Sequence, residues 1–257
     1  MTDRQTPQSA RFEGGHPHGG RLWRVLVVTI FLFLFAGFTA LGVWQVYRLG
    51  WKLALIERVE TRIHAAPVVA PPPDVTITRD DHEYLRVKVS GRFRHDLETP
   101  VKAVTDLGGG WWILTPLETD RGFTVLVNRG FVPPELKEPS SRPDAPETAS
   151  VTGLLRLGEG DGGFLRHNDP AANNWYAREV PAILSTRGVT GPAASYFIDA
   201  QADTAGPAEW PRAGLTVVKF TNSHLVYALT WFGLAAGSLI AMVLVLRERR
   251  RKEQADA

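Results

Sequence analysis

Two long stretches without a charged side chain constrain this chain more than any other feature of its sequence. No Asp, Glu, Lys or Arg occurs in residues 25–47, and none occurs in residues 220–246. A helix needs about 20 apolar residues to cross the hydrocarbon core of a bilayer, and residues 25–47 and 224–246 meet that length. The sequence therefore predicts two transmembrane helices on either side of a large domain.

The charges beside these stretches predict how the chain crosses the membrane. Residues 1–24 carry four basic and two acidic side chains, and residues 247–257 carry five basic and three acidic ones. Basic flanks stay on the cytoplasmic side, whereas long domains cross largely regardless of charge. We therefore expect both tails to be cytoplasmic and residues 64–215 to be periplasmic.

The first stretch is predicted to stay in the mature protein. The apolar core of a signal peptide usually has about 7–15 residues, and this longer run is not followed by a clear cleavage site. Asp3 and Glu13 lie in the N-terminal tail, which lacks the amphipathic Arg/Ser pattern of a mitochondrial transit peptide. These features favour the inner membrane of a bacterium.

Between the two stretches, the spacing of apolar residues changes from helical to alternating. Helical spacing continues to about residue 64, and the prolines of residues 68–73 end that helix. Apolar and polar side chains then alternate from Glu83 to Phe93, which is typical of a strand. Further strand candidates are residues 101–105, 111–118, 122–132, 150–157, 195–199 and 215–220. The sequence predicts a predominantly antiparallel β domain, either a small barrel or a sandwich.

Three segments of this domain are predicted to lie outside the strands. Residues 178–186 have the pattern of a short helix. The glycine cluster 108–110 is expected in a turn between strands, and the proline-rich residues 133–149 in an exposed loop.

The composition and motifs exclude several classes of chemistry. The chain has no cysteine, which excludes disulfides, thiolate metal sites and cysteine nucleophiles. Its 29 basic and 27 acidic residues leave a net charge of +2, so there is no broad surface for nucleic acid. HExxH, GxSxG and P-loop motifs do not occur in the sequence. We therefore expect a protein that is not an enzyme.

His224 stands at the outer end of the second predicted helix. A titratable side chain that enters a membrane is costly and suggests a function. Tyr227 and Trp231 share its helix face, and a neutral imidazole beside aromatic rings suits the axial ligation of haem iron. The alternative is a histidine that bonds backbone or lipid headgroups, with Tyr227 and Trp231 in an interfacial aromatic belt.

A second stripe of small residues lies roughly opposite His224, at Gly233, Gly237 and Ala241. Small residues four apart allow close helix approach in a membrane. This stripe is predicted to contact the first helix through Ala36 and Ala40; the alternative is that it reflects ordinary membrane-helix composition.

Several motifs, taken in order, resemble the surfeit locus protein 1 family of cytochrome c oxidase assembly factors. They extend over nearly the whole chain, and their order makes the resemblance specific. The matching segments are LGVWQVYRLGWK (41–52), SGRF (90–93), VNRGFVP (127–133), GLLR (153–156), NWY (174–176) and NSHLVY followed by TW (222–231). Phe131 stands where the family commonly has tryptophan, and Glu179 where aspartate is common.

The resemblance implies a membrane-held factor that binds haem a transiently as cargo and assists its delivery to oxidase subunit I. His224 occupies the position of the family's proposed haem ligand. Subunit I and haem a synthase are the protein partners that it suggests. The alternative function is a scaffold that holds oxidase subunits or haem a synthase and binds no haem.

The motif at the end of the first helix adds candidate contacts for the cargo. Gln45, Arg48, Trp51 and Lys52 lie on neighbouring parts of one helix face. Arg48 and Lys52 could meet haem propionates while Trp51 offers a flat apolar contact; alternatively, these are cations that snorkel within an aromatic belt. In the VNRGFVP segment, Asn128 and Gly130 are expected to form a structural turn, and Arg129 is a candidate contact for a partner or a propionate.

Overall fold

The computed structural model describes residues 18–143, 145–160, 166–202, 210–215 and 220–255. The chain divides into two compact units. One consists of Met1–Ala54 with Thr221–Ala257, and the other of Leu55–Phe220. We call them the helical unit and the barrel unit.

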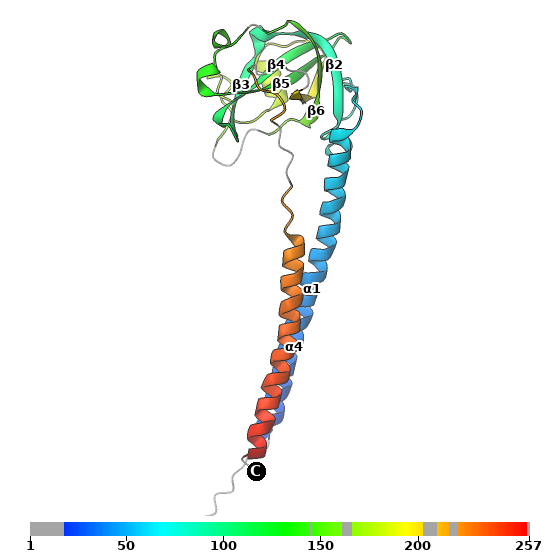
Figure 1. The fold of residues 1–257 in the computed structure, drawn as a ribbon, viewed down its shortest axis with the longest axis vertical. Coiled ribbons are helices and arrows are strands. Elements are labelled where there is room, and N and C mark those ends of the chain that lie inside the picture. The colour runs from blue at the N-terminus through cyan, green and yellow to red at the C-terminus, as the bar shows by residue number, and fades with distance from the viewer. Residues whose placement is uncertain (1–17, 144, 161–165, 203–209, 216–219, 256–257) are drawn as a thin grey trace, which may run out of the picture. The chain divides into compact units, whose positions relative to one another are not determined.

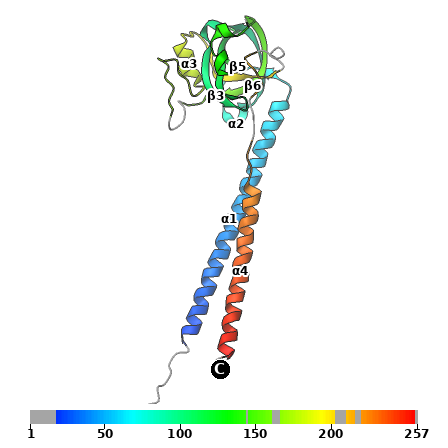
Figure 2. The same ribbon diagram turned by 60° about the vertical axis from the view of Figure 1, so that its left-hand side comes forward.

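The helical unit is built from α4 (His224–Ala255) and most of α1 (His18–His64). The last turns of α1, which follow Ala54, belong to the barrel unit. Both helices are long and apolar enough to cross a membrane, with mean hydropathy of 2.5 and 2.2 in their most apolar windows. They run side by side in Figures 1 and 2. The helix that we expected to end near residue 64 ends at His64, and α4 extends past residue 246 to Ala255.

The two helices pack through residues spaced three and four apart. Gly42 and Gln45 are tightly packed on α1, and the buried positions of α4 are Ala228, Ala235 and Ser238. Phe38 stacks on Trp231 with ring centroids 5.8 Å apart, and a Cβ at Gly42 would lie 2.6 Å from the Phe232 ring. This alternation of three and four is the spacing by which two helices keep one seam in contact.

The predicted contact through Gly233 and Gly237 is wrong. A Cβ added at either glycine would meet nothing within 4 Å. Each residue turns a helix by roughly 100°, so Gly237 lies about 200° around α4 from Ala235, which is buried in the contact. The face that carries His224 makes the contact, and the small-residue stripe points away from it.

The barrel unit is mostly strand, as the sequence predicts. Its strands are β1 (Val68–Val69), β2 (Arg86–Phe93), β3 (Thr99–Thr105), β4 (Gly108–Thr119), β5 (Thr124–Val132), β6 (Thr148–Leu157) and β7 (Ala193–Ala200). Short helices α2 (Arg79–His82) and α3 (Val180–Thr186) and the 3-10 turns η1 (His95–Leu97), η2 (Pro134–Leu136) and η3 (Pro139–Ser141) connect them.

The strands form a small closed barrel. Its ring order is β2-β6-β7-β5-β4, and the pairing of β2 with β4 closes it. Most pairs are antiparallel, whereas β5 pairs with β7, and β1 with β2, in parallel. The predicted fold class, two apolar helices flanking a predominantly antiparallel β domain, is confirmed.

Two apolar clusters hold the barrel together, one inside the ring and one under α3. Val125 and Val127 of β5 point into the ring, while Leu126 between them packs outside with Ile183 of α3. Because both faces of β5 are covered, its apolar residues form a nearly continuous run. Figure 2 shows α3 beside the strands that it covers.

Two local expectations need correction. The three glycines 108–110 lie in β4, paired with Thr105, Val104 and Ala103, so the turn precedes the glycine cluster and does not contain it. The described residues of the 133–149 segment are mostly exposed, as we expected, but they form η2 and η3 and enter β6, and the Arg142 side chain, which is 4% exposed, lies inside the unit. The strand candidate at 215–220 lies mostly outside the described residues.

Candidate functional site

His224 is the first residue of α4 and lies on the face that packs against α1. Its backbone N–H donates to Asn222 Oδ1 over 3.3 Å, and its ring Nδ1 lies 2.7 Å from Oε1 of Gln45. Gln45 is 8% exposed. The histidine is thus held at a helix start by two polar contacts, one from its own segment and one from α1.

The contact with Gln45 sets the tautomer of the His224 ring. A carbonyl oxygen only accepts hydrogen bonds, so Nδ1 carries the proton and donates it to Gln45 Oε1. In the neutral ring, Nε2 then keeps its lone pair. An imidazole whose second nitrogen donates to a carbonyl is the arrangement that proteins use to orient histidine ligands of metals. His224 therefore has the chemistry of a ligand through Nε2.

The aromatic residues predicted beside His224 have different surroundings. Trp231 lies in the helix contact, stacked on Phe38. Tyr227 is 52% exposed. The structure therefore places Trp231 in the same seam as His224 and leaves Tyr227 on the outer surface of the helical unit.

The structure also separates the residues of the predicted α1 face. Gln45 points into the helix contact, whereas Arg48 and Trp51 are exposed and pair with each other, with the guanidinium carbon 4.2 Å from the Trp51 ring centroid. Lys52 is half-buried. The pairing of Arg48 with Trp51 leaves a cationic and aromatic surface on α1, next to the turn that carries Gln45.

Gln45 is a functional candidate that the sequence places on the same helix face as Arg48 but does not mark as a site residue. The available signal was a strongly polar amide inside a stretch of 23 residues without charge. Such a residue is expected to find a partner on a neighbouring helix. The identity of the partner required the structure, because His224 is 179 residues away in the sequence.

In the barrel unit, Asn128, Arg129 and Gly130 form a bulge within β5 and not the turn that we expected. Between two paired positions, β5 has one residue more than β4: Leu114 pairs with Asn128, and Trp112 with Phe131. Asn128 Nδ2 donates to Asp199 Oδ1 over 2.8 Å, and Asn128 Oδ1 accepts from the Gly130 N–H over 3.2 Å. The bulge fixes the direction of the Arg129 side chain.

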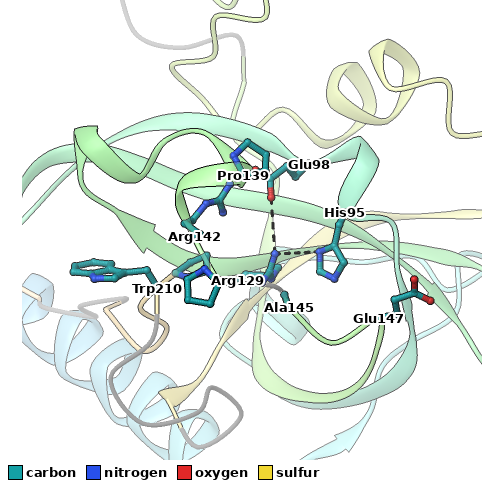
Figure 3. A pocket seen from close by; sticks show the side chains of 10 residues that line it. His95, Glu98, Arg129, Pro139, Arg142, Ala145, Glu147 and Trp210 are labelled. Atoms are coloured by element: carbon teal, nitrogen blue, oxygen red, sulfur yellow. Dashed lines mark hydrogen bonds and ion pairs between the residues drawn. The ribbon is translucent and has the colours of Figure 1, made fainter.

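Arg129 points into a pocket of about 360 Å³ on the barrel unit (Figure 3). Its guanidinium lies 3.8 Å from Glu98 and donates to His95 Nδ1 over 3.2 Å. Because arginine only donates, His95 Nδ1 accepts, and His95 Nε2 donates to the Pro146 carbonyl over 3.1 Å. His95 is therefore the neutral tautomer with its proton on Nε2. In His224 the proton is on Nδ1 instead. Both ring nitrogens of His95 take part in hydrogen bonds.

Two guanidinium groups share one carboxylate in this pocket. Arg142 forms an ion pair with Glu98, and the side chains of both are less than 10% exposed. Burial, together with the nearby charge of Arg142, holds the pKa of Arg129 below its usual value, and Glu98 opposes this only in part. The arrangement is a buried Arg–Glu–Arg triad that fastens the 133–149 segment to the barrel.

The histidines that the structure describes do not assemble into a metal centre. Within the ranges that the structure describes, no three His, Asp or Glu side chains come together in a way that could hold a metal ion. His224 could supply one ligand to a metal, so most of the other ligands would have to come from a group that already surrounds that metal.

The chain has relatives among known proteins. A family model described as the SURF1 family matches residues 32–236. Surfeit locus protein 1 of Mus musculus is 36% identical over 216 residues, which cover 77% of this chain and 68% of the mouse protein. The human protein of the same name is 34% identical over 235 residues (84% and 74%), and a SURF1-like protein of Monosiga brevicollis is 32% identical over 244 residues (90% and 89%).

Proposed function

The chain belongs to the SURF1 family, and from this membership we propose that it is an assembly factor for haem-copper cytochrome c oxidase. Its proposed task is to bind haem a transiently and to assist delivery of that cargo to subunit I, with haem a synthase as a second partner. It is proposed to act as a carrier and not as an enzyme, in a bacterial inner membrane with the barrel unit in the periplasm.

The observation that carries this proposal is the pair formed by His224 and Gln45. The pair orients a neutral imidazole at the start of an apolar helix and leaves Nε2 as the ligand atom. Haem iron already has four ring nitrogens and needs only axial ligands from a protein, so one histidine is sufficient to hold it. The lack of a three-residue metal cluster among the described residues favours such a cargo over a bare ion.

The contacts around the pair support a planar, partly apolar cargo. Trp231 lies in the same seam as His224, and the cation–aromatic pair of Arg48 and Trp51 lies on α1 close to Gln45. An arginine beside an aromatic ring suits a ligand that combines carboxylates with a flat apolar body. Tyr227 and Lys52 remain proposed contacts on the surrounding surface.

The test is the haem content of the full chain purified from cells that make haem a. The wild-type protein is expected to show a Soret band, and His224→Ala to lose it while membrane levels stay unchanged. Gln45→Leu removes the acceptor that orients the ring and is expected to weaken retention about 10–100-fold.

His64→Ala is the matched control. The His64 ring also contacts a carbonyl oxygen of α1, that of Glu60, but the His64 side chain is exposed. It should retain the full band. An unchanged spectrum in His224→Ala would refute the ligand assignment. A colourless wild-type protein that still supports oxidase assembly would favour the scaffold function.

A further inference from the structure

A groove lies between the first turns of α1 and the last turns of α4, far along both helices from His224. Its volume is about 530 Å³, and its lining consists of Trp23 from α1 and Leu244, Val245, Glu248, Arg249 and Lys252 from α4. The guanidinium carbon of Arg249 lies 4.0 Å from the centroid of the Trp23 ring. This cation–π contact joins the two helices at the groove.

The groove has an apolar part and a charged part, and they meet where the uncharged stretches end. The charge-free stretch of α1 begins just after Arg24, and that of α4 ends just before Arg247. Leu244 and Val245 therefore lie within the apolar span, whereas Arg249 and Lys252 lie beyond it. A groove that crosses this boundary matches a molecule with an apolar tail and a polar head.

The charged part of the groove has an excess of positive charge. Lys252 Nζ lies 3.8 Å from Glu248 Oε1, and residues 247–252 together carry five basic side chains and one acidic one. The same turns of α4 carry three more arginines, Arg247, Arg250 and Arg251, which are exposed. Charge complementarity thus favours a negatively charged head group.

We propose that this groove is a binding site for one anionic phospholipid. Its acyl chain lies against Trp23, Leu244 and Val245, and its phosphate lies at Arg249 and Lys252, where arginine can donate two parallel hydrogen bonds. The proposal depends on the two helices spanning a bilayer and is independent of haem binding at His224.

The test measures lipid retention by native mass spectrometry on the full chain, purified in mild detergent and stripped of lipid. Dioleoyl phosphatidylglycerol and dioleoyl phosphatidylethanolamine have the same acyl chains and differ in net charge. Wild-type protein should bind the phosphatidylglycerol more tightly, and Arg249→Ala should reduce that preference about fivefold, the effect of one basic residue at a membrane surface. Trp23→Ala should weaken both lipids, because it removes part of the apolar wall.

Arg250→Ala is the matched control, since it removes the same charge from the neighbouring residue, which does not line the groove. It should leave the preference nearly unchanged. Equal losses in Arg249→Ala and Arg250→Ala would overturn the proposal in favour of general attraction to a basic tail. Equal binding of the two lipids by the wild-type protein would also overturn it. Recovery of each variant in the membrane fraction separates these outcomes from failed insertion.

Discussion

Glu98 is the carboxylate that Arg129 and Arg142 share inside the barrel unit. Glu98→Gln leaves two buried guanidinium groups without a compensating charge, and the free energy of unfolding should fall by about 3–5 kcal/mol. Glu118→Gln is the control, because Glu118 pairs with Arg94 at the surface, where the side chains are 49% and 38% exposed. That change should cost about 0–1 kcal/mol. Urea unfolding of the full chain in detergent, followed by near-ultraviolet circular dichroism, measures both; similar losses would contradict the buried triad.

Gly130 is a residue whose backbone no other amino acid adopts without strain. Its φ is +136°, and an added Cβ would lie 2.3 Å from the carbonyl carbon of Arg212. Gly130→Ala should therefore lower stability by at least about 1–3 kcal/mol. In Gly109→Ala the new methyl group meets nothing within 4 Å, and the change should be within about 0.5 kcal/mol. If thermal melting showed equal shifts for both variants, the bulge in β5 would not have the assigned conformation.

Single residues differed in how far the sequence could predict them. His224 is a candidate from the sequence because a titratable side chain at the start of an apolar span is costly, and that argument needs no neighbour. Gln45, Glu98 and Arg142 could not be assigned in the same way, because each role depends on a partner far away in the chain. Arg142 lies in a segment whose proline-rich composition indicated exposure, and only its pairing with Glu98 accounts for its burial.

At the scale of elements, the seam between α1 and α4 can be tested with two glycines. Gly42 lies against Phe232, whereas the surroundings of Gly237 are open. Gly42→Leu should force the helices apart at a cost of about 1–3 kcal/mol, and Gly237→Leu should be tolerated. The chain has no cysteine, so a disulfide between Phe38→Cys and Trp231→Cys reports helix proximity on mild oxidation. A lower yield with Gly237→Leu than with Gly42→Leu would refute this seam.

Elements were predictable where their signal is local. The alternation in β2 and the proline run after α1 depend on neighbouring residues, and both elements were recognised. The glycine cluster at 108–110 was misassigned because glycine favours turns by itself, although Gly110 is required in β4, where a Cβ would lie 2.2 Å from the Val132 carbonyl oxygen. The parallel pairing of β5 with β7 joins residues about 70 apart, and no local pattern encodes it.

For the whole molecule, the proposed orientation has a direct test that uses the absence of cysteine. Val104 is 88% exposed on the barrel unit, and Arg251 is exposed near the end of α4. In intact spheroplasts, a membrane-impermeant maleimide should label Val104→Cys and should reach Arg251→Cys only after the membrane is permeabilised. The physical reason is that the basic flanks stay on the cytoplasmic side. The opposite labelling pattern would reverse the orientation.

The order of strands in the closed ring has a consequence for how the protein is made. Although β7 is the last of the described strands in sequence, it lies between β6 and β5, so the ring is incomplete until residues Ala193–Ala200 have been added. Until then, β5 and β6 each present an unpaired edge, a template for association with other chains. Pairings between distant segments also form slowly. A chain cut short anywhere before β7 should therefore lose the whole barrel and be degraded or aggregate, so that late truncations are as damaging as early ones.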